Sequence, residues 1–488
     1  MSWWNMASKT AEEFSVVRDC GPSERMFTAW HHLGLYYRIS NTAALRIPRA
    51  KLGNASVSHL IRTAVAQVML KQPVMRVGII GEHTKRPQFV ALSSIDLSQQ
   101  IEDAQAASLG DVAKSLEKFL LQPWPDLSRR PGWHVQIFHE TNLGEAEFCR
   151  VRICLTVHHA ICDGMSMAIF LSNLIKALND PDSDVVLMVD KSPIIELTDD
   201  LTDYPPPQDQ AVKLTGDLTW VLSQLWRYGM PKILKPFSLK KWGGGPYDPH
   251  IKALHLRYME IDSTYTQAII KKCRQKGSTL TNLLNALCIV SFARRAPITE
   301  RHGFENSTSI SLRPWISDQT PLDKERMSLR VSGYNPEFGP DILDKVRHGV
   351  DSDVWDLAVR LRQDMKRKTD TMPHNDFSFL VPYTGDFLDL SRSMYGKERD
   401  VLWGLSNLGS IAAPPENSPW QLENVMFAQI YPTVTAALAV SVASVDGGDM
   451  IICFMWQDGI LETKLVEDVK DDFETWLMNL GKEGYLGV

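Results

Sequence analysis

A pair of histidines followed by an Asp-Gly turn is the part of this chain best suited to chemistry. Residues 158–164 read His-His-Ala-Ile-Cys-Asp-Gly. Imidazole is the side chain that most readily accepts and returns a proton near neutral pH. The segment therefore predicts a site of acid–base chemistry, with His158 and His159 as the candidate proton acceptors.

The residues on either side of the pair predict the elements that hold it. Residues 152–157 form an apolar run typical of a buried strand, and residues 165–178 carry apolar side chains at helical spacing. A side chain at a strand end is held by a rigid element, which favours a well-defined site. Cys162 and Ser166 lie nearby, but neither has the context of a nucleophile elbow. We therefore expect no covalent enzyme intermediate.

Strands and helices alternate along both halves of the chain, which indicates an α/β protein. We expect helices over residues 24–37, 58–70, 109–121, 165–178, 280–295, 352–369 and 464–480. We expect strands over residues 74–80, 88–92, 133–138, 152–157 and 308–312. The Asp-Gly-Gly-Asp turn at 446–449 predicts a hairpin of residues 434–444 and 450–456.

A polar, proline-rich stretch at residues 199–210 is the best candidate for a boundary between two units. We expect one subdomain over residues 1–205 and a second over 206–488, with a linker and hinge at about 199–250. The three glycines at 243–245 lack the Lys-Ser or Lys-Thr that follows a phosphate-binding loop. We interpret them as a flexible hinge.

The bulk composition excludes several classes of protein. The 488 residues carry a net charge of −6, which argues against a general nucleic-acid binder. No apolar stretch reaches the roughly 20 residues that span a bilayer, and the N-terminus lacks a signal-peptide pattern. The seven cysteines have no zinc-site spacing, and neither histidine pair, 31–32 or 158–159, has a third ligand at metal spacing. We therefore expect a cytoplasmic protein without a metal site.

Residues 211–242 combine aromatic and aliphatic side chains with six basic residues and the single acid Asp217. Such a segment favours one of two interpretations. It contacts a membrane surface, or it covers the subdomain junction and leaves a basic face in solvent. Pro231 and Pro236 interrupt the helical pattern, which favours the second interpretation.

Five segments together resemble one family of acyltransferases. They are residues 158–164, Arg-Asp-Cys-Gly-Pro-Ser-Glu-Arg at 18–25 with His-His-Leu-Gly at 31–34, Ser-Leu-Arg-Pro at 311–314, Ser-Asn-Leu-Gly at 406–409 and Met-Trp-Gln-Asp-Gly at 455–459. They are similar to the fungal alcohol O-acetyltransferase family. That family shares the His-His-x-x-x-Asp-Gly signature with chloramphenicol acetyltransferases, peptide-synthetase condensation domains and plant BAHD acyltransferases. Asp-Val-Leu-Trp-Gly at 400–404 departs from the Asp-Phe-Gly-Trp-Gly of the plant enzymes.

The resemblance implies two chloramphenicol-acetyltransferase-like subdomains, each a mixed β-sheet flanked by helices, with an active-site channel between them. It also implies an acyl-CoA-dependent O-acyltransferase that acetylates a hydroxyl of a small-molecule, secondary-metabolite alcohol. Acetyl-CoA or another acyl-CoA would be the co-substrate, and no cofactor would be permanently bound. Two fused subdomains favour a monomer.

The resemblance also implies a role for each residue of the motif. His159, the second histidine, would be the general base, and His158 would support the loop. Asp163 would point away from His159 and form a bidentate ion pair with Arg313. Gly164 would leave room where a side chain would crowd the turn.

Several alternatives stay open at this stage. Ser406 or Asn407 donates a hydrogen bond to the reaction oxyanion, or both residues belong to a capped loop. Lys397 and Arg399 contact the phosphates of coenzyme A, or they lie on a solvated surface. The histidines at 31–32 line the channel, or they have a structural role.

Two other functions compete with acetyl transfer from coenzyme A. A condensation-like enzyme would use a carrier-protein acyl donor, an amine acceptor, or the same tunnel for a cyclisation. A binding protein with a vestigial site is the other candidate, and the intact His159, Asp163 and Gly164 argue against it. A carrier-protein donor would be distinguished by the failure of free coenzyme A thioesters.

Overall fold

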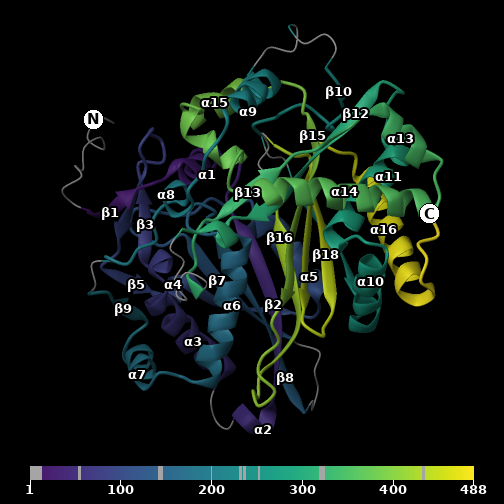
Figure 1. Cartoon of the computed structure of the whole chain (residues 1–488). Coiled ribbons are helices and arrows are strands. Elements are labelled where there is room, and N and C mark those ends of the chain that lie inside the picture. Colours follow the sequence, from purple (N-terminus) through teal and green to yellow (C-terminus); the bar gives the residue numbers. More distant parts are fainter. Residues whose placement is uncertain are drawn as a thin grey trace.

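Two large β-sheets, one built mainly from each half of the chain, organise the structure (Figure 1). The computed structural model describes residues 14–52, 56–140, 147–198, 201–229, 234, 238–250, 253–317, 325–430 and 435–488. Both sheets mix parallel and antiparallel strands and carry helices against them, which confirms the predicted α/β class.

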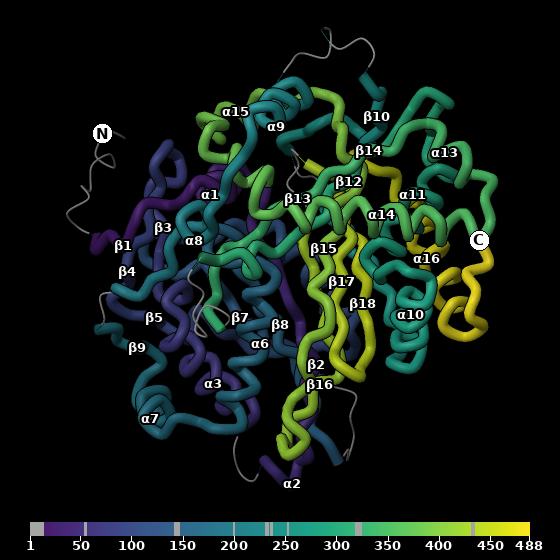
Figure 2. The backbone as a smooth tube through the Cα atoms, viewed as in Figure 1, coloured from purple at the N-terminus to yellow at the C-terminus, as the bar shows by residue number. Residues whose placement is uncertain are grey.

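The first sheet has five strands in the order β16-β2-β8-β7-β6. Their bounds are β2 (Ile39–Pro48), β6 (Ile101–Ala106), β7 (Trp133–Glu140), β8 (Phe148–Val157) and β16 (Gln421–Gln429). The last of these comes from the second half of the chain and pairs antiparallel with β2. Figure 2 shows the yellow-green β16 beside the purple β2. A single boundary at 205/206, which stays a prediction, therefore does not account for every strand of this sheet.

The second sheet has eight strands, six of them in the order β10-β12-β15-β17-β18-β11. The remaining two, β13 and β14, pair with β12. The bounds are β10 (Lys240–Lys241), β11 (Leu254–Ile261), β12 (His302–Ser311), β13 (Val331–Tyr334), β14 (Glu337–Phe338), β15 (Val401–Ile411), β17 (Leu438–Val445) and β18 (Met450–Gln457). The antiparallel pairing of β17 with β18 confirms the predicted hairpin.

Two small sheets complete the strands of the first half. One orders β1 (Ser15–Asp19), β4 (Gln88–Ala91) and β3 (Val77–Ile80), and the other pairs β5 (Ser94–Asp96) with β9 (Ile194–Glu196). The strand predicted over 74–80 begins only at Val77, because Pro73 opens a 3₁₀ turn over Pro73–Arg76.

Helices cover both sheets (Figure 1). Those of the first half are α1 (Pro22–His32), α2 (Arg49–Leu52), α3 (Val57–Lys71), α4 (Leu97–Gln100), α5 (Leu109–Phe119), α6 (Gly164–Asn179) and α7 (Ser183–Lys191). Those of the second half are α8 (Gln208–Ala211), α9 (Leu218–Gln224), α10 (Ser263–Gln275), α11 (Leu280–Arg295), α13 (Pro340–Arg347), α14 (Asp351–Thr371), α15 (Phe387–Met394) and α16 (Thr463–Glu483).

Most of the predicted helices are confirmed. The apolar residues of α5 and α6 recur at the spacing of the face that each helix buries, whereas α11 is buried on all sides. The helix predicted over 24–37 is an exception and ends at His32. Gly34 adopts a left-handed backbone with φ of 74°, which stops the helix. The strand predicted over 308–312 is longer and begins at His302. The polar Glu305 breaks the apolar pattern in the sequence, but its ion pair with Lys241 lets it lie buried in β12.

The glycines at 243–245 form a close backbone crossing. A Cβ atom on Gly243 would lie 2.5 Å from the carbonyl oxygen of Arg399, and one on Gly244 would lie 2.7 Å from that of Ile460. Gly245 donates its N–H to the same Ile460 oxygen at 2.7 Å. This packing explains the three glycines without the predicted hinge.

Part of the 211–242 segment presents apolar side chains to solvent. Leu218, Leu222, Leu225 and Trp226 lie on one face of α9 and the turn after it, and each is more than half exposed. Because this apolar face is exposed, it does not cover the subdomain junction. The interpretation that the sequence favoured is therefore wrong for this face. Residues 230–233 and 235–237 of the segment lie outside the described residues. Among the described helices, none is both long and apolar enough to span a membrane.

The glycine crossing predicts a difference between two Gly→Ala variants. Gly244 and Gly277 both have a left-handed backbone, but only Gly244 has atoms where a Cβ would go. Gly277→Ala should lower the free energy of unfolding by about 1–2 kcal/mol, from backbone strain alone. Gly244→Ala should cost distinctly more, because a packed backbone must also shift. Thermal and urea unfolding measure both losses, and equal losses would argue against the close crossing.

Candidate active site

The histidine pair lies in a tight turn at the end of β8. His158 donates its backbone N–H to the Gly132 carbonyl at 2.7 Å, and its ring Nδ1 accepts the backbone N–H of Ala160 at 3.0 Å. A Cβ on Gly132 would lie 2.9 Å from that of His158, so the two segments approach closely. His158 is 1% exposed. It therefore fixes the turn from inside the protein.

Asp163 begins α6 and holds the turn from the other end. Its Oδ1 accepts the backbone N–H of Ser166 at 2.9 Å, which caps the helix. Its Oδ2 accepts Nη1 of Arg313 at 2.8 Å and the backbone N–H of Arg330 at 2.8 Å. Burial alone would raise the pKa of Asp163, but Arg313 and these hydrogen bonds lower it below its usual value. The carboxylate is therefore ionised and occupied by partners other than His159.

The predicted pairing of Asp163 with Arg313 is present, but it is not bidentate. The second fork nitrogen, Nη2, donates to Oγ of Ser166 and to the carbonyl oxygen of Ser328, each at 2.9 Å. The second carboxylate oxygen is not available, because it caps α6. Arg313 thereby links the first turn of α6 to two segments of the second half.

Gly164 lets the second half approach the motif. A Cβ on Gly164 would lie 2.7 Å from Cδ2 of Leu408 in β15 and 3.0 Å from Cζ of Phe427 in β16. A side chain at this position would require Leu408 and Phe427 to move. The predicted need for room is met, and the structure shows which side chains occupy the space.

His159 lies against aromatic rings and is half-buried. The ring of Phe27, on α1, stacks on it with the centroids 4.0 Å apart and the planes 11° apart. The ring of Tyr36 is 5.7 Å away. Burial lowers the pKa of His159 to about 4, although the backbone of His159 and Cys162 and the charge of Asp163 favour the protonated ring. The imidazole is therefore neutral at pH 7.

The other two candidate nucleophiles of the turn are held in inactive forms. Burial raises the pKa of the Cys162 thiol well above its ordinary value, so the thiolate is not populated at neutral pH. The Ser166 hydroxyl exchanges hydrogen bonds with Asp163, Ser328 and Arg313. Both observations support the expectation that no covalent intermediate forms.

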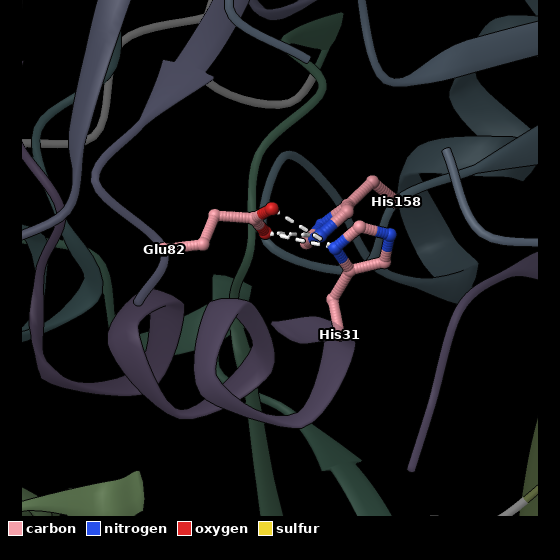
Figure 3. Close-up of side chains that lie close together, drawn as sticks. All are labelled: His31, Glu82 and His158. Atoms are coloured by element: carbon pink, nitrogen blue, oxygen red, sulfur yellow. Dashed lines mark hydrogen bonds and ion pairs between the residues drawn. The ribbon is translucent and has the colours of Figure 1, made fainter. Parts of the chain in front are cut away.

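Glu82, which the sequence did not indicate, joins His31 to His158 of the motif. The carboxylate of Glu82 lies 3.0 Å from Nδ1 of His31 and 3.3 Å from Nε2 of His158 (Figure 3). His31 is buried, and its two ring nitrogens face Glu82 and the backbone of Trp124, which favours the structural interpretation of this residue. Glu82 lies 51 residues from His31 and 76 from His158 in the sequence. Spacing therefore offers no signal for the cluster, and no local pattern indicates the Phe27 stack.

Ser406 and Asn407 point to opposite faces of β15. Nδ2 of Asn407 donates to Oγ1 of Thr281 in the first turn of α11, and its Oδ1 accepts the N–H of Gly409. The Ser406 hydroxyl shares a hydrogen bond with Ser309 at 2.8 Å, on the face that carries Leu408. The loop-capping interpretation therefore fits Asn407, and Ser406 is the better placed of the two to face the motif.

The basic residues suggested for coenzyme A have different environments. Lys397 is exposed, whereas Arg399 is 1% exposed and stacks over the ring of Tyr247 at 4.4 Å. Arg399 also donates to the carbonyl oxygen of Thr435. A solvated surface position for Arg399 is therefore wrong, because the guanidinium is satisfied inside the protein.

A cavity of about 820 Å³ lies away from the motif. It is bordered by α3, the C-terminal half of α6 and residues 412–419, and none of its lining residues belongs to 158–164. This cavity is therefore not the predicted channel, which stays a prediction.

The fold has the chloramphenicol-acetyltransferase architecture. The trichothecene 15-O-acetyltransferase TRI3 from Fusarium sporotrichioides matches with a TM-score of 0.69 and 13% identity, over 93% of each chain. The first condensation domain of the CDA synthetase matches with a TM-score of 0.60 and 13% identity, over 97% of this chain and 98% of the other. The likeness at this identity is one of fold.

The family follows from the sequence comparisons. The model of the alcohol acetyltransferase family matches residues 21–468. The probable alcohol acetyltransferase FCK4 of Fusarium pseudograminearum is 56% identical over 476 residues, which are 97% of each chain. The probable alcohol acetyltransferase crmB of Aspergillus fumigatus is 22% identical, over 92% of this chain and 97% of the other. The chain belongs to the alcohol acetyltransferase family, so it is an acetyltransferase with an alcohol acceptor and an acyl donor.

Breaking the buried ion pair between Asp163 and Arg313 should cost more stability than breaking an exposed ion pair. Asp163→Asn leaves the Arg313 charge buried without its counterion, which should cost about 3–5 kcal/mol of unfolding free energy. Glu325→Gln breaks the ion pair with Lys176, in which both side chains are about 60% exposed, and should cost at most about 0.5 kcal/mol. Urea unfolding of both variants measures the difference. A loss in D163N as small as that in E325Q would contradict this account of the pair.

Proposed function

We propose that this protein transfers the acetyl group of acetyl-CoA to a hydroxyl of a small-molecule, secondary-metabolite alcohol, with His159 as the general base. The observation that carries the proposal is a neutral imidazole at a strand end, half-buried and without a carboxylate partner among the described residues. Acetyl-CoA would be a co-substrate, with no permanently bound cofactor. The cytoplasmic location and the monomeric state stay predictions.

The geometry supports one particular ring nitrogen as the base. Nδ1 of His159 is buried and has no hydrogen-bond partner of good geometry within the described part of the chain. Nε2 is therefore the nitrogen that we assign to proton exchange with substrate. The Phe27 stack would limit rotation of the ring, so that Nε2 keeps its direction.

The reaction would proceed in two proton transfers. His159 takes the proton of the acceptor hydroxyl as that oxygen attacks the thioester carbonyl carbon. The carbon–oxygen bond forms, and the carbonyl electron pair moves onto oxygen to give a tetrahedral oxyanion. The oxyanion collapses, the carbon–sulfur bond breaks, and the coenzyme A thiolate takes the proton back from His159.

The oxyanion requires a hydrogen-bond donor, and we assign this role to Ser406 rather than Asn407. Ser406 lies on the face of β15 that carries Leu408, and Leu408 lies against Gly164 of the motif. The amide of Asn407 is committed to Thr281 and Gly409. A preorganised donor of this kind contributes about 3–4 kcal/mol to a tetrahedral intermediate.

Removal of the base tests the proposal. His159→Ala should lower kcat by about 10²–10⁴-fold, because the hydroxyl loses its proton acceptor. Cys162→Ala should keep kcat, because the buried thiol takes no part. Release of free coenzyme A from acetyl-CoA, with a panel of primary and secondary alcohols, measures both. Transfer only from longer acyl-CoA or from a loaded carrier protein would contradict the choice of acetyl-CoA, and undiminished turnover by H159A would contradict the base.

Binding of the donor gives a readout that is independent of the base. Acetyl-CoA at 100 times its dissociation constant should stabilise the protein by about 2.7 kcal/mol, and it should do so in H159A as well as in the wild type. Thermal unfolding with and without acetyl-CoA makes this measurement. This shift in stability shows whether H159A still binds acetyl-CoA, so that a lower kcat in H159A can be assigned to the lost base.

The lowered pKa of His159 predicts the pH dependence of turnover. The ring accepts a proton only when neutral, so activity is lost as the pH falls through the pKa of about 4. We expect kcat/KM to stay level from about pH 8 down to pH 6.5, the ordinary pKa of histidine, with the acid limb below that value. A pH profile of kcat/KM makes the measurement. An acid limb at or above about pH 6.5 would contradict the burial argument.

A further inference from the structure

The cluster of His31, Glu82 and His158 holds two protons in defined places. Each ring presents one nitrogen to the Glu82 carboxylate (Figure 3). The other nitrogen of each ring faces a backbone N–H. Nε2 of His31 accepts from Trp124 at 3.2 Å, and Nδ1 of His158 accepts from Ala160 at 3.0 Å. A nitrogen that accepts carries no proton. The protons therefore lie on Nδ1 of His31 and Nε2 of His158, and both point at Glu82.

This arrangement argues against a metal ion in the same cluster. The three ligand atoms lie within 4.8 Å of one another, which is close enough for a cation. A histidine that binds a metal through one nitrogen normally donates the N–H of the other to an acceptor. Here the second nitrogen of each ring faces a backbone donor instead. Metal binding would require both rings to lose their only proton.

The electrostatics agree with an ionised Glu82 carboxylate. Burial opposes ionisation of Glu82, but the hydrogen bonds from His158 and His31 outweigh it and lower the pKa of Glu82 to about 2. The side chain of Glu82 is only 16% exposed and that of His158 only 1%. A carboxylate that accepts two N–H groups in such surroundings holds both rings firmly.

The same helix contacts both histidines of the motif. Phe27 and His31 lie one turn apart on α1, on the face that it buries. Phe27 stacks on His159, and His31 reaches His158 through Glu82. The start of the helix is fixed by Glu24, which accepts the N–H of Gly21 at 2.6 Å and pairs with Arg18 at 2.7 Å. A shift of α1 would therefore move both rings.

We propose that Glu82 is a positioning residue for the acetyl transfer. It locks His31 and His158 in opposite tautomers, and this lock, with the Phe27 stack, fixes the turn that presents His159. The inference rests on the proposed role of His159. It assigns Glu82 no contact with substrate.

The tautomers test the lock without any turnover. In the protein labelled with ¹⁵N-histidine, His31 should carry its proton on Nδ1 and His158 on Nε2. The chain has 13 histidines, and the loss of one signal in His31→Asn and in His158→Asn assigns the two rings. Protons on the nitrogens that face Trp124 and Ala160 would overturn the proposal, even if no Glu82 variant folds.

Glu82→Gln tests the effect on chemistry. The amide oxygen of glutamine can accept the N–H of one ring, but its NH₂ group must then face the N–H of the other ring. Neither ring can move its proton to its second nitrogen, because that nitrogen faces a backbone N–H. We expect kcat to fall about 10–100-fold with the KM for acetyl-CoA unchanged, because the base is misplaced while the donor still binds. Glu305→Gln is the matched control, because Glu305 is also buried, 1% exposed, and paired with Lys241 and Arg227 in the second half. It should lose stability and keep kcat.

A double variant separates positioning from general destabilisation. In H31N/E82Q the asparagine amide can turn its oxygen toward the glutamine NH₂, while the glutamine oxygen still accepts from His158. The double variant should therefore recover kcat relative to E82Q. A kcat in E82Q equal to that of E305Q, no recovery in the double variant, or stoichiometric zinc bound by the wild type and lost in E82Q would each overturn the proposal. Undiminished turnover in H159A would instead reject the proposed function.

Discussion

The buried ion pair between Asp163 and Arg313 connects the two halves of the protein at the point where the chemistry is expected. Asp163 accepts hydrogen bonds from the first turn of α6, from Arg313 and from the backbone of Arg330. A buried carboxylate is tolerated only when such partners satisfy it. The segments around residues 313 and 330 must therefore sit against the start of α6, and this fixes where the second half lies relative to the histidine turn.

A second constraint comes from the close packing on the other side of the turn. Gly164 admits Leu408 and Phe427 from the second half, and Gly132 admits His158 from the end of β8. The strand β16 pairs with β2, so the second half also supplies an edge strand to the first sheet. The proposed site is therefore built jointly by both halves, and the histidine turn is packed closely between them.

The environment of the histidine pair divides the work between two similar side chains. His158 is buried, and a carboxylate and a backbone N–H fix its two nitrogens. His159 lies half-buried against Phe27, and burial keeps it neutral. The first ring can therefore hold the turn, while the second has the protonation state that a general base requires. The sequence alone presents the two as equivalent, and the family resemblance was needed to choose between them.

The sequence by itself determined the elements with a strong local signal: α6 by its helical spacing, α11 by a capped apolar run, and the β17–β18 hairpin by its turn residues. It also indicated the motif at 158–164, because that information lies within a few adjacent residues. The partner of Asp163 was found through the family resemblance. Only the tertiary structure decided that Phe27 stacks on His159 and that Glu82 joins His31 to His158. Those contacts link residues far apart in the chain through three-dimensional packing, which leaves no local pattern to read.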